Sequence, residues 1–267
     1  MSLVDFKEIP LANTGSGEQD TFELFARDFF WNLGFQVEEN PSRGADGGKD
    51  IILIEPLVGI FSHIELRWLV SCKHFAHSGN SVSRKHEIDI HGRVKVYKCD
   101  GFIAFYSTLP SSGLANILNA IKNEVSVQVY DKARIEHFLV TEQRLRIVLQ
   151  RYFPNSYKAI TQNYTWEKLY TTVLILASGN GSVQDRLIDA YISSLMRLEP
   201  DDLPKVLRKE FSELQYKLTR VEPSYPGEGR IHATISKMDN IEANKVVEQI
   251  ISIYDRFRVN LIDDLRH

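Results

Sequence analysis

The sequence predicts an α/β fold in which helices flank a mixed β-sheet, followed by an all-α C-terminal domain. Two observations support this prediction. Between residues 16 and 140, apolar runs of strand length alternate with segments whose apolar residues recur at helical spacing. Beyond residue 151 the strand-like runs stop and amphipathic helical segments follow. We therefore expect an N-terminal α/β domain at residues 1–150 and a helical domain at residues 151–267.

The elements of the first domain follow from the period of their apolar residues. Phe22, Phe25 and Phe29 recur at helical spacing before Gly34, which ends the first helix. "DIILI" at 50–54 alternates little, as is typical of a strand buried on both faces, and "PLVG" after it predicts a turn. In chain order we expect a helix at 18–33, strands at 35–39, 50–54 and 64–75, a helix at 81–97, a strand at 101–108, a helix at 111–124, a strand at 125–130 and a helix at 132–140.

The C-terminal domain shows four helical segments. Ser182 and Asp185 have the spacing of a helix cap, which explains "GNGS" at 179–182 better than a phosphate-binding loop, because no Gly-Lys-Ser/Thr follows it. The expected helices run from 158 to 177, from 182, from about 201 and from 241 to 257. We expect this domain to bind a partner, mediate oligomerisation or regulate the first domain, although such helices also describe an ordinary bundle.

Composition narrows the class of protein. Of 267 residues, 43% are hydrophobic and 25% charged, which excludes wholesale disorder. A net charge of −3 argues against a protein that coats nucleic acid by charge alone, but it leaves room for a local basic groove. Two cysteines make no disulfide framework, the N-terminus does not resemble a signal peptide, and no apolar run approaches the roughly 20 residues of a membrane span. We expect a cytoplasmic protein without a membrane segment.

Polar residues on two predicted strands indicate a reactive site. Ser71 and Lys73 lie two residues apart, so they face the same side of their strand. If this strand pairs with the one that opens on Asp50, the three side chains converge at one edge of the sheet. A carboxylate, a second oxygen ligand and a lysine can hold Mg²⁺ and prepare a water molecule to attack a phosphodiester. Alternatively, Asp50 caps a Gly-rich loop and Lys73 protects an edge strand from aggregation.

Several motifs occur in an order that resembles one nuclease family. They are Phe22-Glu23, "GF" at 34–35, "GADGGKDI" at 44–51, "VSCK" at 70–73 and "GFIAFYST" at 101–108. Together they resemble the Mrr-like branch of the PD-(D/E)xK nuclease superfamily over about residues 16–140. The resemblance implies a restriction-endonuclease-like fold.

The resemblance also implies roles for particular residues. Asp50 would be a metal ligand, Lys73 the catalytic lysine and Glu23 an assisting carboxylate on the first helix that also reaches the metal. Ser71 departs from the family pattern, which has Gln or Glu there. Because a serine hydroxyl is a shorter, uncharged ligand, the metal would depend more on Asp50, Glu23, water and a backbone carbonyl.

Other polar residues receive weaker interpretations. Asp46, Gly47 and Gly48 would form a loop that supports the site. The basic segment before residue 98 is either a solvated helix face, with Ile88, Val94 and Tyr97 on its apolar side, or a phosphate-binding patch. Its candidate nucleic-acid contacts are Arg84, Lys85, Arg93 and Lys95.

Two further residue types suggest no site of their own. The histidines at 74, 77, 86 and 91 lack the cysteine partners or HExxH frame of a zinc site. Cys72 alternates with Ser71 and Lys73, so it should face the other side of the strand and pack in the core.

The leading functional prediction is a Mg²⁺-dependent endonuclease, with Mn²⁺ as an alternative ion. DNA is the expected substrate and RNA is left open. The resemblance implies restriction or anti-phage defence, with a homodimer or a partner protein of the same defence system as candidate assemblies. The rival prediction is a catalytically inactive nuclease fold that binds nucleic acid or a protein, because Ser71 replaces an acid. A third places the main function in the helical domain, as an adaptor.

Overall fold

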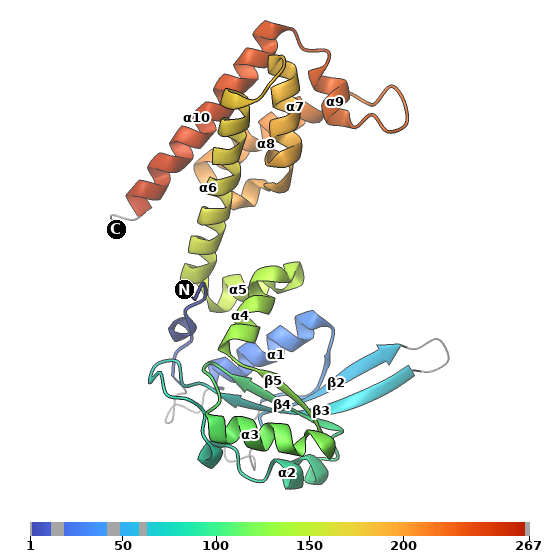
Figure 1. The fold of residues 1–267 in the computed structure, drawn as a ribbon, viewed down its shortest axis with the longest axis vertical. Helices are drawn as coiled ribbons and strands as arrows, with labels where there is room; N and C mark the ends of the chain where they lie inside the picture. The colour runs from blue at the N-terminus through green and yellow to red at the C-terminus, as the bar shows by residue number, and fades with distance from the viewer. Residues whose placement is uncertain (1, 12–18, 42–48, 59–62, 265–267) are drawn as a thin grey trace. The chain divides into compact units, whose positions relative to one another are not determined.

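The computed structural model describes residues 2–11, 19–41, 49–58 and 63–264. The chain divides into two compact units, Met1–Tyr157 and Lys158–His267 (Figure 1). The expected boundary after residue 150 falls within helix α5 (Arg146–Tyr152), and α5 contacts α1 and α4 of the first unit. Each unit has a hydrophobic core of its own.

A mixed five-stranded sheet forms the centre of the first unit, as predicted. Its strands lie side by side in chain order and are β1 (Gln36–Glu39), β2 (Ile51–Val58), β3 (His63–Lys73), β4 (Gly101–Tyr106) and β5 (Ser126–Tyr130). The pairs β1–β2 and β2–β3 are antiparallel, whereas β3–β4 and β4–β5 are parallel. The last three strands therefore end at the same edge of the sheet.

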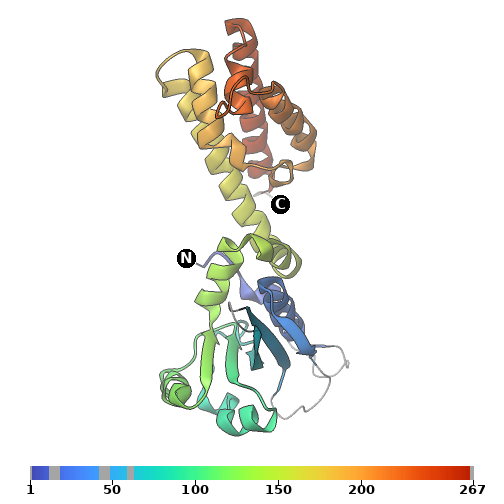
Figure 2. The same cartoon turned by 90° about the vertical axis from the view of Figure 1, so that its right-hand side faces the viewer.

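Helices cover both faces of this sheet (Figure 2). On one face, Phe22, Phe25 and Phe29 of α1 are buried, and all three rings contact Phe105 of β4. On the other face, residues of α2 and α3 pack against β4 side chains such as Phe102. The helices of this unit are α1 (Thr21–Leu33), α2 (Ile90–Val96), α3 (Ser112–Ala120), α4 (Lys132–Thr141) and α5, with 3-10 turns η1 (Phe6–Glu8), η2 (Arg84–His86), η3 (Ile121–Asn123) and η4 (Gln143–Leu145).

The end of the first helix lies where the sequence places it. Gly34 follows α1 with φ of 101°, a left-handed conformation that costs glycine little, and its N–H caps carbonyls of the last turn.

The expected turn at "PLVG" is wrong for Pro56 to Val58, because these residues continue β2 as the outer half of a hairpin with β3. Strand β1 pairs with β2 only as far as Ile54. Proline has no N–H to donate, but Pro56 lies beyond this pairing, so no hydrogen bond between β1 and β2 is lost there.

The single helix expected at 81–97 is also wrong. The segment forms η2, then an extended stretch, then α2, which begins after Asp89 in a left-handed conformation with φ of 47°. Asp89 caps α2 through the N–H of Gly92. Ile88, expected on the apolar side, is 72% exposed, whereas its neighbour Glu87 is buried. An ion pair and a hydrogen bond made by Glu87 account for this reversal.

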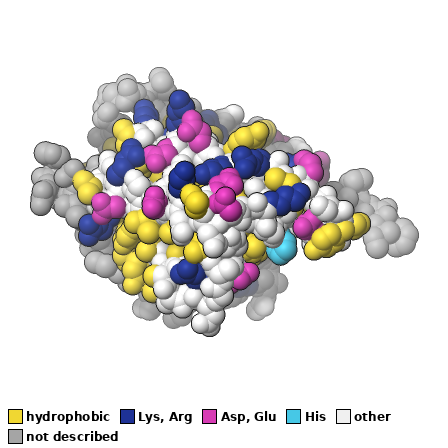
Figure 3. Space-filling model, turned by 90° about the horizontal axis from the view of Figure 1, so that it is seen from above, with side chains coloured by type: hydrophobic (Ala, Val, Ile, Leu, Met, Phe, Trp, Pro, Cys, Tyr) yellow, Lys and Arg dark blue, Asp and Glu magenta, His cyan; other side chains and the backbone are white. Residues whose placement is uncertain are grey.

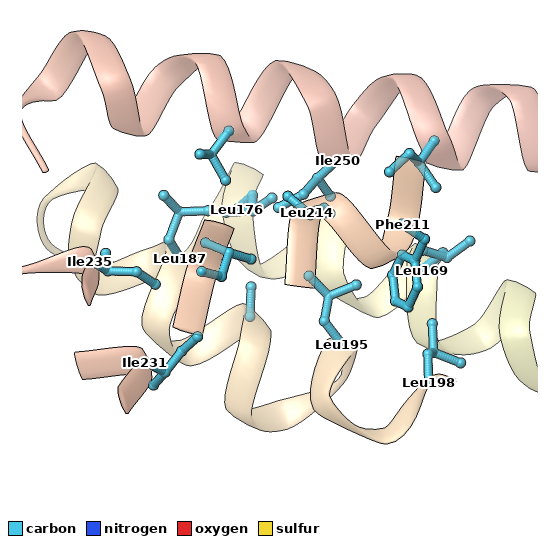
Figure 4. Packing of buried hydrophobic residues seen from close by; sticks show 14 of the residues in the cluster. Leu169, Leu176, Leu187, Leu195, Leu198, Phe211, Leu214, Ile231, Ile235 and Ile250 are labelled. Atoms are coloured by element: carbon cyan, nitrogen blue, oxygen red, sulfur yellow. The ribbon is translucent and has the colours of Figure 1, made fainter. Parts of the chain in front are cut away.

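The second unit is all-helical, as predicted. Its helices are α6 (Pro154–Ser178, whose first residues belong to the first unit), α7 (Val183–Ser193), α8 (Lys205–Thr219), α9 (Arg230–Ile235) and α10 (Asn240–Asp264), with 3-10 turns η5 (Leu195–Arg197) and η6 (Pro200–Asp202). Leu169, Phe211 and Ile250 belong to one apolar cluster that all these α-helices help to build (Figure 4). Ser182 and Asp185 cap α7 reciprocally, which confirms the interpretation of "GNGS".

Among the described residues, none of the helices combines the length and the apolar character needed to cross a bilayer.

Candidate active site at the ends of strands β2 and β3

The register between β2 and β3 places Asp50 opposite Ser71. Ile51 pairs with Val70, and the Asp50 N–H donates to the Val70 carbonyl at 3.2 Å. In an antiparallel pair the next residue outward therefore faces Ser71 on the same side of the sheet. Both side chains are buried: that of Asp50 is 9% exposed and Ser71 is fully covered. The convergence expected from the sequence is present.

Lys73 lies among three oxygen atoms of this site. Its Nζ donates to Ser71 Oγ at 2.9 Å and to the Cys72 carbonyl at 3.1 Å, and it lies 3.6 Å from Asp50 Oδ2. The Cys72 N–H donates to the same Asp50 oxygen, which fixes the carboxylate against the strand. A carboxylate, a hydroxyl and a carbonyl oxygen thus surround the Lys73 ammonium at the sheet edge.

The charges around Lys73 keep it protonated. Burial alone would lower the pKa of its ammonium, but Asp50 and then Glu87 stabilise the positive charge more strongly, so the pKa is raised. Lys73 is therefore a cation at neutral pH. It can stabilise negative charge on a bound phosphate, but it is not poised to act as a general base.

Glu87 is a buried acid near Lys73 that the sequence prediction missed. Its side chain is fully covered, accepts a 2.9 Å hydrogen bond from Tyr106 Oη and pairs with Arg93 at 2.5 Å. Tyr106 lies beside Lys73 in the β3–β4 register. Desolvation first, and then the charge of Glu87, raises the pKa of the Tyr106 hydroxyl far above its ordinary value, so it stays a donor. The sequence gives no signal that Glu87 is buried. In this charged segment the apolar residue next to it, Ile88, is the one expected in the core, yet Ile88 faces solvent in the structure.

Glu23 lies in the first turn of α1, within electrostatic reach of the site. Burial raises the pKa of the Cys72 thiol, and the charges of Asp50 and Glu23 raise it further. Cys72 is buried, as predicted, and a thiol with a raised pKa is a poor nucleophile. The role of Glu23 as an assisting ligand stays a prediction.

The other predicted residues lie in different settings. Asp46, Gly47 and Gly48 fall outside the described residues. Lys85 and Lys95 are exposed, and exposed Arg84 donates to the Gly113 carbonyl at 3.1 Å. Arg93, which pairs with Glu87, is only 13% exposed at its side chain. Nucleic-acid contact by these four basic residues stays a prediction.

Comparison with known proteins shows which family the N-terminal part of the chain resembles. Residues 16–113 match a family model of the Mrr catalytic type, described as restriction endonuclease. Over these residues the chain is similar to the restriction endonuclease family. Asp50, Ser71 and Lys73 all lie inside the matched range. No curated protein matches the chain.

Two solved structures share partial similarity with the chain. One is the DNA modification-dependent restriction endonuclease AspBHI, at 17% identity and a TM-score of 0.38, covering 53% of this chain and 35% of that one. The other is the MspJI restriction endonuclease in complex with a 27-mer oligonucleotide, at 17% identity and a TM-score of 0.32, covering 49% of this chain and 27% of that one. The chain thus aligns with about a third of each enzyme.

The donor atoms of the Asp50–Lys73 site fit a hard divalent cation. Oxygen ligands suit Mg²⁺, which proteins often hold through one or two carboxylates together with substrate phosphates and water. Asp50 supplies one carboxylate, and Ser71 Oγ and the Cys72 carbonyl are further oxygen donors, which here accept hydrogen bonds from the Lys73 ammonium. Within the described part of the chain, no group of three or more His, Cys, Asp or Glu side chains is arranged to hold a metal.

Proposed function

We propose that the chain is a divalent-metal-dependent DNA endonuclease whose chemistry takes place at Asp50, Ser71 and Lys73. The observation that carries this proposal is the set of three oxygens around the Lys73 ammonium, at the end of β3 in a part of the chain that is similar to the restriction endonuclease family. Mg²⁺ is the proposed ion, with Mn²⁺ as a substitute. We further propose DNA as the substrate and restriction or anti-phage defence as the setting.

In this proposal each residue has a separate task. Asp50 Oδ2, held by the Cys72 N–H, provides the negative charge that holds the cation, with help from Ser71 Oγ and the Cys72 carbonyl. A divalent ion bound there would polarise the phosphate and lower the pKa of an attacking water. The Lys73 ammonium stabilises the charge that develops on the phosphoryl oxygens.

Cleavage of linear, circular and methylated DNA, and of RNA, in Mg²⁺, Mn²⁺ or EDTA tests the proposal. We expect metal-dependent cleavage of DNA that falls by at least about 100-fold in Asp50→Asn and in Lys73→Ala, because each removes a charge on which the transition state depends. The exposed residues Glu124 and Lys122 offer matched controls, and Glu124→Gln and Lys122→Ala should cleave as the wild type does. Cleavage that persists in both site variants would overturn the assignment.

A second candidate function is a nuclease fold that binds DNA without cutting it. Ser71 favours this alternative, since a hydroxyl stands where the family pattern has Gln or Glu and already accepts a hydrogen bond from Lys73. DNA binding that persists in EDTA and in both site variants, without cleavage under any of these conditions, would support it.

The defence role has its own test. Cells expressing the wild type should form fewer phage plaques than cells expressing Asp50→Asn at equal protein level. Equal plaque counts across a broad phage panel would contradict the defence role while leaving the nuclease proposal intact.

A further inference from the structure

A pocket lined by apolar, charged and hydroxyl-bearing residues lies in the first unit, outside the Asp50–Lys73 site. It has a volume of about 360 Å³, at the small end of the range of ligand sites, and its charged lining residues are Asp5, Lys7 and Lys132. Ser81, Ser107 and Thr108 supply hydroxyl groups to its wall. Two ammonium groups against one carboxylate leave the pocket with a net positive charge.

The topology of the sheet places this pocket at the edge that holds Lys73. Strands β3, β4 and β5 are parallel, so they end together (Figure 1). Lys73 ends β3, Ser107 and Thr108 follow β4, and Lys132 comes two residues after β5. The Ser107 N–H donates to the Lys73 carbonyl at 3.1 Å, which joins the pocket wall to the backbone of the active-site lysine. The carboxyl edge of parallel strands is where α/β proteins commonly bind ligands.

Two buried hydroxyl groups in the wall have a proton to donate. Ser107 Oγ accepts hydrogen bonds from the N–H groups of Phe75 and Ala76, at 2.8 and 3.1 Å, so its own proton stays available. Thr108 Oγ1 is buried and has no hydrogen-bond partner among the described residues. Thr108 Oγ1 therefore calls for an acceptor oxygen, whereas Ser107 is fully covered.

The segment that carries Lys7 is held in place by contacts of its neighbours. Phe6 packs against Phe153 at 5.2 Å between ring centroids, and the Asp5 N–H donates to Ser156 Oγ at 2.9 Å, so the segment around Lys7 is anchored. Glu136 lies one turn beyond Lys132 on α4; its carboxylate accepts from Ser2 and Val4 and also interacts with the charge of Lys132. Among the described residues neither Lys7 nor Lys132 forms an ion pair. Asp5 Oδ1 accepts the Lys7 N–H, so that carboxylate is partly engaged by the backbone.

We propose that this pocket binds a phosphate group, and that the phosphate belongs to the DNA backbone beside the bond that is cleaved. Lys7 and Lys132 would neutralise its charge, while Thr108 Oγ1 would donate to one of its oxygens. The proposal that the phosphate comes from DNA rests on the proposed function, because it assumes that DNA occupies the neighbouring Asp50–Lys73 site. Free inorganic phosphate offers the same chemistry, and the experiment separates the two sources.

The test measures equilibrium binding of a duplex oligonucleotide in EDTA, in the full chain carrying Asp50→Asn, across a range of salt concentrations. Adding Lys7→Ala and Lys132→Ala should weaken binding several-fold and reduce the slope of log K against log salt by about 1.8, or about 0.9 for each phosphate charge that a lysine no longer neutralises. Thr108→Val removes a hydroxyl and no charge, so it should weaken binding while the slope of log K against log salt stays close to that of the protein with Asp50→Asn alone. Lys122→Ala, an exposed lysine outside the pocket, should leave both affinity and slope unchanged.

A second arm titrates inorganic phosphate and follows the thermal unfolding midpoint of the same proteins. If the double lysine variant loses phosphate-dependent stabilisation but keeps its DNA affinity and salt slope, the DNA source is overturned and free phosphate is the ligand. If neither DNA binding nor phosphate stabilisation changes, the pocket assignment is overturned. DNA binding through the pocket in a wild type that cuts no DNA would contradict the nuclease proposal and support the pocket.

Discussion

At the scale of single residues, Ser71 is the position where this site differs from the family pattern. Its hydroxyl accepts from Lys73 at 2.9 Å and lies on the same side of the sheet as Asp50. It can therefore position the lysine as well as contact a cation, whereas a carboxylate there would add charge.

This dual role predicts the behaviour of Ser71→Ala. Loss of a hydrogen bond to a charged group costs about 1.5–3 kcal/mol, so we expect cleavage to fall by about 10- to 100-fold. The concentration of Mg²⁺ needed for half-maximal rate should rise. A rate and a metal requirement equal to those of the wild type would show that the hydroxyl contributes to neither task.

His74 makes stability depend on pH. Burial lowers the pKa of its imidazole below the ordinary value of 6.5, although the Ile9 carbonyl, which lies 2.9 Å from Nε2, acts in the opposite direction. Nδ1 is buried without a partner among the described residues, so a proton there would be a buried donor with no acceptor. The folded state thus favours the neutral ring.

A lowered folded-state pKa gives stability that is complete above pH 6.5 and is lost as the pH falls through the folded value. We expect His74→Gln, which keeps a donor for Ile9, to lose less stability between pH 7.5 and 5 than the wild type does. Urea unfolding at both pH values measures the difference. Identical losses in the two proteins would contradict this account.

At the scale of elements, the buried pair of Glu87 and Arg93 fixes the segment that precedes α2 against β4. Tyr106 of β4 donates to one Glu87 oxygen and Arg93 of α2 pairs with the other. This attachment holds the extended stretch between η2 and α2 in place, and α2 begins only after Asp89, which has a left-handed conformation.

Removing one partner of a buried ion pair leaves the other charge uncompensated. We expect Glu87→Gln to lower the free energy of unfolding by about 3–5 kcal/mol, measured by urea denaturation. Tyr106→Phe removes only the hydroxyl and should cost about 1.5–3 kcal/mol. If Glu87→Gln proved no more destabilising than Tyr106→Phe, the ion pair would not hold this segment.

At the scale of the whole molecule, the two units have separate cores. The cluster around Phe211 contains residues of the second unit alone, and the core around Phe102 and Leu114 belongs to the first. Charges of both signs are interspersed on the face shown in Figure 3, in keeping with the net charge of −3. DNA binding by this chain would therefore depend on local groups such as Lys7 and Lys132.

Separate cores predict that destabilisation stays local. Phe211→Ala should cost about 3–5 kcal/mol in the unfolding of the second unit and leave the first unchanged. Calorimetry should show one transition moving to lower temperature while another stays in place. Movement of every transition by the same amount would mean that the units unfold together.

The sequence alone determined the fold class and most elements, because local signals specify them. The aromatic spacing of α1, the left-handed Gly34 and the Ser182–Asp185 cap each act within a few residues. Alternation within β3 likewise placed Ser71 and Lys73 on one face, and the family motifs placed Asp50 near them.

Only the tertiary structure decided what depends on contacts between distant segments. The register of β2 against β3 brought Asp50 to Ser71, and burial against β4 turned Glu87 inward while Ile88 faced solvent. The pocket between Lys7 and Lys132 joins residues that lie far apart in the chain. The spacing of hydrophobic residues indicates which face of a helix or strand is apolar. It does not indicate which buried charged residue will pair with a residue from a distant segment.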